Sequence, residues 1–98
     1  MKIPTELTLM GIPIKIEIDN TFVKRYGRIA SIDYIKQIIT IDTSHPKETV
    51  EQALIHEICH MIMYIMGEEE LQKNEKFIDI LAHLIYQALA TAKYDHKA

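Results

Sequence analysis

The segment from Ala53 to Met66 constrains the fold more than any other part of this chain. All of its residues are apolar or aromatic except His56, Glu57 and His60. A run of this length favours a helix that packs in the core of the protein. Positions i and i+4 lie one above the other on a helix, so His56 and His60 share one face. Burying three polar side chains is costly unless something compensates them, and a bound cation would do so.

These three polar residues form the motif His56-Glu57-Ile58-Cys59-His60, which has the pattern H-E-x-x-H. In this pattern the two His bind one metal ion, and the Glu acts as general base on a water molecule. The alternative is a surface helix with an ordinary His pair, but the flanking residues leave little polar surface for it. Cys59 projects about 100° around the helix from His60. We therefore interpret Cys59 as a core residue rather than a ligand.

Length and composition predict a single domain over residues 1–98, with one core. The net charge of −3 and the absence of a basic stripe argue against a nucleic-acid partner. No apolar run reaches membrane-spanning length, and the N-terminal residues lack the pattern of a signal peptide, so no membrane partner is expected. The single cysteine fits a reducing compartment. Together these features predict a cytoplasmic protein.

The two halves of the chain predict different secondary structure. Over residues 5–43, apolar residues alternate with polar ones, most clearly from Ile12 to Ile18, and residues 26–32 and 35–41 are further strand candidates. Two helices are expected over residues 46–66 and 70–92, joined by a short connection at Gly67. His45 lies at the start of the first helix and is interpreted as part of that start. The fold expected is α+β, with a small antiparallel sheet packed against a helical hairpin.

The hairpin predicts which residues lie opposite the two His. In an antiparallel hairpin, residues equidistant from the turn face one another. Counted from Gly67, His60 is opposite Glu75 and His56 is opposite Asp79. Glu75 and Asp79 are themselves four residues apart, so they share one face of the second helix.

A catalytic zinc site usually has three protein ligands and one open position. We expect Glu75 to be the third ligand. We expect Asp79 to accept the N–H of the non-ligating nitrogen of His56, because metal-bound His usually needs such a partner. The reverse assignment, with Asp79 as ligand, stays open. The acidic run from Glu68 to Glu70 is more typical of a helix start than of a metal site.

The two segments together resemble the zincin metallopeptidases. Asn74-Glu75-Lys76-Phe77-Ile78-Asp79 is similar to the N-E-x-x-x-D segment that follows H-E-x-x-H in the gluzincin branch. The short gap between the motifs looks more like the small ImmA/IrrE-type and phage-borne metallopeptidases. The resemblance extends over residues 35–90. It implies a minimal zincin-like domain in which His56, His60 and Glu75 bind the metal.

The resemblance also implies an activity. It indicates a peptidase with one Zn²⁺ per chain and a protein or peptide substrate, such as a regulatory protein of a phage or mobile element. It suggests that the substrate lies along an edge strand formed by Ile38, Ile39, Thr40 and Ile41. Larger zincins supply a His or Tyr that stabilises the transition state, and the candidates for that role in this chain are Tyr64, His83 and Tyr86.

Two other interpretations stay open. A non-catalytic, zinc-stabilised binding module is the first, because a domain of this size has limited core energy. An interaction protein without a metal is the second. Glu57 favours the enzyme, since a structural site has no need of a base there. The same ligands could also hold iron, nickel or cobalt.

Overall fold

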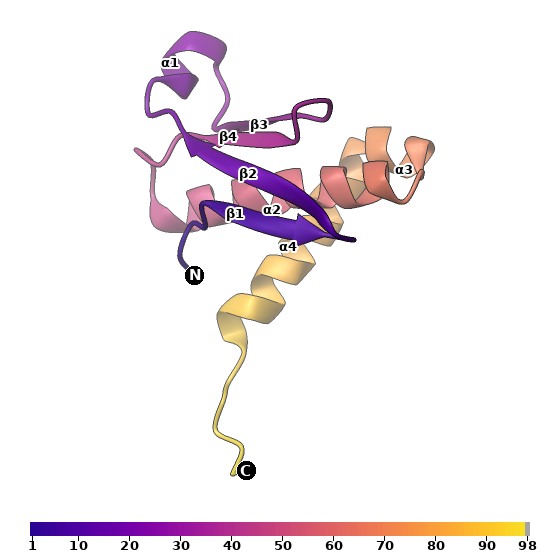
Figure 1. The fold of residues 1–98 in the computed structure, drawn as a ribbon. Coiled ribbons are helices and arrows are strands. Elements are labelled where there is room, and N and C mark those ends of the chain that lie inside the picture. The colour runs from indigo at the N-terminus through magenta and orange to yellow at the C-terminus, as the bar shows by residue number, and fades with distance from the viewer. Residues whose placement is uncertain (98) are drawn as a thin grey trace.

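The computed structural model describes residues 1–97, which form a four-stranded sheet and four helices (Figure 1). The strands are β1 (Glu6–Leu9), β2 (Ile12–Ile18), β3 (Ala30–Asp33) and β4 (Ile38–Ile41). The helices are α1 (Phe22–Tyr26), α2 (Lys47–Ile65), α3 (Glu69–Lys73) and α4 (Glu75–Thr91). This composition confirms the α+β class. None of the helices in the described residues has the length and apolar character needed to span a bilayer.

The sheet is mixed, so the prediction of an antiparallel sheet is wrong. Its strand order is β1-β2-β4-β3, and β2 pairs with β4 in parallel while the other two pairs are antiparallel. The cause is the route of the chain after β2. The chain passes through α1, forms β3 at the far edge, and returns as β4 between β2 and β3.

The strand order also shows that the prediction of an edge strand at Ile38–Ile41 is wrong. Residues Ile38–Ile41 form β4, which is paired on one side with β2 and on the other with β3. The main chain of β4 is therefore occupied on both sides and has no free edge for a peptide. The edge strand on this side of the sheet is β3.

Alternating isoleucines join the sheet to α2. Ile14, Ile16, Ile39 and Ile41 are buried, and they pack with residues of α2 that include Leu54. Because side chains alternate between the two faces of a strand, this spacing places them all on one face. The resulting core holds α2 against the sheet, and Figure 1 shows α2 lying behind the strands.

The helix expected over residues 70–92 is interrupted at Asn74. This residue has an extended conformation (φ −84°, ψ 92°), and its side-chain oxygen accepts a hydrogen bond from the backbone N–H of Phe77. Asn74 therefore caps α4, as Asn commonly does. The five residues of α3 form a separate helix before it.

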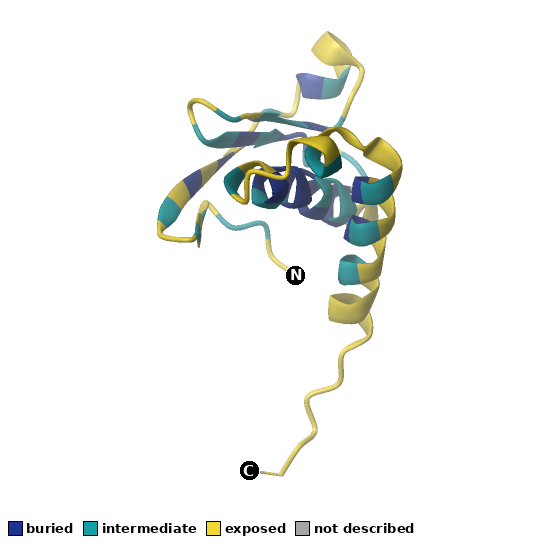
Figure 2. Cartoon of the chain, turned by 90° about the vertical axis from the view of Figure 1, so that its right-hand side faces the viewer, coloured by how far each residue is buried: buried dark blue, intermediate teal, exposed yellow. Residues whose placement is uncertain are grey.

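A second core cluster fixes α4 against α2. Ile78 and Ala82 of α4 are buried, and they pack against Ile55, Cys59 and Met63 of α2. Only the first part of α4 takes part in this contact. Its last turns project from the body of the molecule and are exposed (Figure 2).

Replacement of Ile39 by Ala should destabilise the fold strongly. Ile39 is fully buried in the core, so Ile39→Ala should lower the free energy of unfolding by about 2 to 5 kcal/mol. Chemical denaturation followed by circular dichroism measures this change. Ile35→Ala is the matched control, because Ile35 is 90% exposed, and it should change the free energy by less than about 0.5 kcal/mol. Equal effects of the two substitutions would contradict this core.

Candidate metal centre

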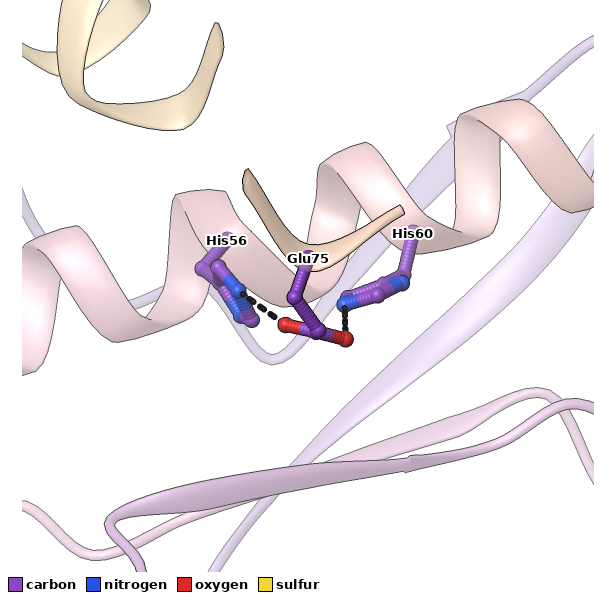
Figure 3. A group of neighbouring side chains, drawn as sticks. All are labelled: His56, His60 and Glu75. Atoms are coloured by element: carbon purple, nitrogen blue, oxygen red, sulfur yellow. Dashed lines mark ion pairs between the residues drawn. The ribbon is translucent and has the colours of Figure 1, made fainter. Parts of the chain in front are cut away.

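Three predicted ligands come together between α2 and α4. One ligand atom of each of His56, His60 and Glu75 lies within 4.8 Å of the others (Figure 3). The two His extend from successive turns of α2, and Glu75 is the first residue of α4. The three residues are therefore close enough to hold a metal ion.

Glu75 lies between the two imidazole rings. Its Oε2 is 3.3 Å from His56 Nε2, and its Oε1 is 3.1 Å from His60 Nε2. Two ligands of a tetrahedral zinc ion, each about 2.0 to 2.2 Å from the metal, lie about 3.4 Å apart. The distances from Glu75 to the two imidazoles are near this value, and imidazole and carboxylate are groups that zinc binds.

The second nitrogen of His60 has a partner that the sequence did not reveal. His60 Nδ1 lies 2.9 Å from the backbone oxygen of Gln72, near the end of α3. Both ring nitrogens of His60 therefore face oxygen atoms. A carbonyl oxygen can only accept, so Nδ1 carries the hydrogen and donates it to Gln72. Nε2 remains for a cation on the side of Glu75.

Asp79 reaches His56, but at a different nitrogen from the one expected. Its Oδ1 lies 2.8 Å from His56 Nε2, which is also the nitrogen that faces Glu75. The other nitrogen, Nδ1, lies 3.4 Å from Glu57 Oε1. Asp79 follows Glu75 by one helical turn, and this places both carboxylates on the same side of the His56 ring. In this arrangement Glu57, rather than Asp79, contacts Nδ1.

The site has an excess of negative charge. Three carboxylates, those of Glu57, Glu75 and Asp79, contact the two imidazoles, and within residues 1–97 none of them forms an ion pair with Lys or Arg. The pKa of His56 is raised above its ordinary value, chiefly by the hydrogen bond to Glu57 and further by the charges of the three carboxylates, against the opposing effect of burial. Such a group of acceptors favours a bound cation.

An open cavity of about 1180 Å³ lies over these residues. The edge strand β3 borders it on one side, and α2 and α4 border it on the other. Glu57 lines the cavity beside the two His. The predicted base therefore lies at the wall of the cavity, next to the candidate ligands.

The three expected candidates for transition-state stabilisation have different positions. His83 lines the cavity from α4. Tyr64 does not line it and instead stacks on Tyr34, with 4.6 Å between ring centroids. The Tyr86 hydroxyl donates a hydrogen bond to the buried Glu51 at 3.1 Å, away from the cavity.

Tyr34 is a cavity residue that the sequence did not indicate. It lines the cavity, and its hydroxyl accepts a hydrogen bond from the side chain of Gln72. Burial raises the pKa of Tyr34 above its ordinary value, and the neighbouring carboxylates Glu57 and Glu75 raise it further. No local pattern marks this residue, because its place depends on β3 lying at the sheet edge.

The remaining polar candidates lie outside the site. His45 is 3.8 Å from Asp42 at the start of α2, in accord with its expected position there. Glu69 is paired with Lys73 on the surface of α3. Cys59 is buried in the second core cluster, as predicted, and burial raises the pKa of its thiol.

No protein family, curated protein or solved structure matches this chain.

Zinc should stabilise the protein through Glu75. Zinc at 100 times its dissociation constant should add about 2.7 kcal/mol to the free energy of unfolding, and Glu75→Gln should lose most of this gain. Thermal unfolding with and without zinc measures the effect. Glu70→Gln is the control, because Glu70 is an exposed residue outside the ligand group. A zinc-dependent shift that is unchanged in Glu75→Gln would contradict the assignment of this ligand.

Proposed function

We propose that this chain is a zinc-dependent metallopeptidase that hydrolyses peptide bonds with Glu57 as its general base. The observation that carries the proposal is the grouping of His56, His60 and Glu75 within 4.8 Å, beside a glutamate on the wall of an open cavity. The resemblance of the two motifs to the gluzincin pattern supports the same conclusion.

The residues of the site have distinct roles in this proposal. A zinc ion held there supplies Lewis acidity, which polarises a carbonyl oxygen and lowers the pKa of water. Glu57 accepts the proton of the attacking water and passes it to the leaving amine. The contact between Glu57 and His56 Nδ1 keeps this carboxylate at the cavity wall. The hydrogen bond from His60 to Gln72 keeps Nε2 of His60 directed to the ligand group.

The proposed peptide site is the free edge of β3, in place of Ile38–Ile41. Ala30, Ser31 and Ile32 of β3 line the cavity. The backbone N–H of Asp42 donates to the carbonyl oxygen of Ile29, so these two residues form a hydrogen-bonded pair of the ladder. Such pairs alternate with non-hydrogen-bonded pairs along antiparallel strands. Ile32 is three positions further along, so it belongs to a non-hydrogen-bonded pair, and its N–H and C=O point to the free edge. An extended peptide added there would pass along the cavity.

The resemblance and the cysteine content support a substrate class and a location. On the resemblance alone, we propose that the substrate is a regulatory protein of a phage or mobile element. We place the activity in the cytoplasm because the single cysteine fits a reducing compartment.

Removal of the base should abolish cleavage without loss of the metal. Glu57→Gln should lower kcat by about 10² to 10⁴-fold while zinc content stays near one ion per chain. Cleavage of a mixed peptide library, followed by mass spectrometry, measures the activity, and metal analysis measures the zinc. Glu70→Gln should cleave like the wild type. Cleavage that survives both a chelator and Glu57→Gln would rule out this mechanism.

The β3 edge should determine substrate binding. Proline lacks the N–H that an added strand would bind, so Ile32→Pro should raise KM for a peptide identified in the library by about tenfold, the cost of about one hydrogen bond. Ile32→Ala is the control for the lost side chain and should raise KM less. Circular dichroism verifies that both variants are folded. Equal KM values for the two variants would contradict peptide binding at this edge.

One observation favours the zinc-stabilised binding module as a second candidate. Asp79 Oδ1 lies 2.8 Å from His56 Nε2, so a fourth protein ligand is available next to the other three. A site closed by four protein ligands is typical of structural zinc. Such a module would bind zinc and cleave no peptide of the library, even as the wild type.

A further inference from the structure

A chain of contacts leads from His60 to the sheet through a single residue of α3. The backbone oxygen of Gln72 accepts the Nδ1 hydrogen of His60 at 2.9 Å. The side chain of the same residue donates a hydrogen bond to the Tyr34 hydroxyl. Gln72 thus joins a candidate metal ligand on α2 to a tyrosine in the turn that connects β3 to β4.

The position of α3 depends on few buried contacts. The helix has five residues, and none of them is buried. Only Leu71 of α3 packs against the second core cluster, and it is partly buried. The last carbonyl groups of a helix lack partners within it, so the Gln72 oxygen can accept a hydrogen bond from His60. It can do so only while α3 stays in place.

Tyr34 is a suitable anchor for this helix. Its ring packs against the main core and stacks on Tyr64, with 4.6 Å between ring centroids. Its hydroxyl is therefore held by two contacts of the ring, independently of α3. A hydrogen bond from Gln72 to a fixed hydroxyl limits how far α3 can move.

We propose that Tyr34 and Gln72 act together as positioning residues for His60 and thereby set the zinc affinity of the site. Tyr34 holds the side chain of Gln72, and the backbone oxygen of Gln72 then holds the Nδ1 hydrogen of His60. His60 keeps the tautomer and orientation that leave Nε2 to the metal. The proposal rests on the zinc-binding part of the proposed function and does not require peptide cleavage.

A double-mutant cycle on zinc affinity tests this coupling. Tyr34→Phe keeps the stacked ring and removes the hydroxyl, and Gln72→Met keeps the chain length and removes the donor. Each loosens the outer partner of His60 rather than removing it, so each should weaken zinc binding by about tenfold, the lower end of the cost of about 10 to 100-fold for losing such a partner. Since both substitutions break the same hydrogen bond, the zinc affinity of the double variant should also fall by about tenfold rather than by about 100-fold. Competition with a chromophoric chelator measures the dissociation constants.

Tyr64→Phe is the matched control. It removes a phenol hydroxyl from the same stacked pair, but no hydrogen bond of the Tyr64 hydroxyl is found within residues 1–97. Its zinc affinity should equal that of the wild type. Additive losses in the double variant, or an equal loss in Tyr64→Phe, would overturn the proposal.

Amide hydrogen exchange of the metal-free protein tests the tether, which is the hydrogen bond from Gln72 to Tyr34 that limits the movement of α3. The amides of Gln72 and Asn74 donate to the carbonyl oxygens of Glu68 and Leu71, along α3 and its two cap residues. They should exchange faster in Tyr34→Phe than in Tyr64→Phe. Equal exchange in the two variants would overturn the tether. Faster exchange with unchanged zinc affinity would overturn its effect on the metal. Failure of the wild type to bind zinc would instead refute the proposed function, and the exchange result would still decide the tether.

Discussion

The packing of α4 on α2 is the interaction on which the site depends. The H-E-x-x-H helix supplies only two candidate ligands, and the third candidate is the first residue of α4. Asn74 ends the preceding segment and caps α4, and Ile78 then packs, fully buried, against Ile55 and Cys59 of α2. These local and tertiary contacts together place Glu75 between the two imidazoles.

Charge explains why this arrangement points to a cation. His60 is buried, and oxygen atoms face both of its nitrogens. His56 lies among three carboxylates, those of Glu57, Glu75 and Asp79. Glu75 and Asp79 both approach Nε2 of His56, so a divalent ion at this position would interact favourably with both carboxylates.

Part of this site could be predicted from sequence because its geometry is local. The i, i+4 spacing of the two His, and of Glu75 and Asp79, is a property of any helix. The matched register across Gly67 identified the residues that meet, although α3 occupies the expected short connection. The cap at Asn74 is a local signal that could also have been used. By contrast, Tyr34, the Gln72 carbonyl and the β3 edge depend on strand order and on packing between distant segments, which periodicity does not encode.

The most direct test of the metal centre is the anomalous X-ray signal of zinc in crystals of the protein purified without a histidine tag. We expect one peak per chain, with His56 Nε2, His60 Nε2 and a Glu75 oxygen each about 2.0 to 2.2 Å from it. We also expect a fourth position free of protein atoms, facing the cavity that Glu57 lines. The absence of a peak between these residues would contradict the metal centre, and a fourth protein ligand at the peak would contradict the peptidase.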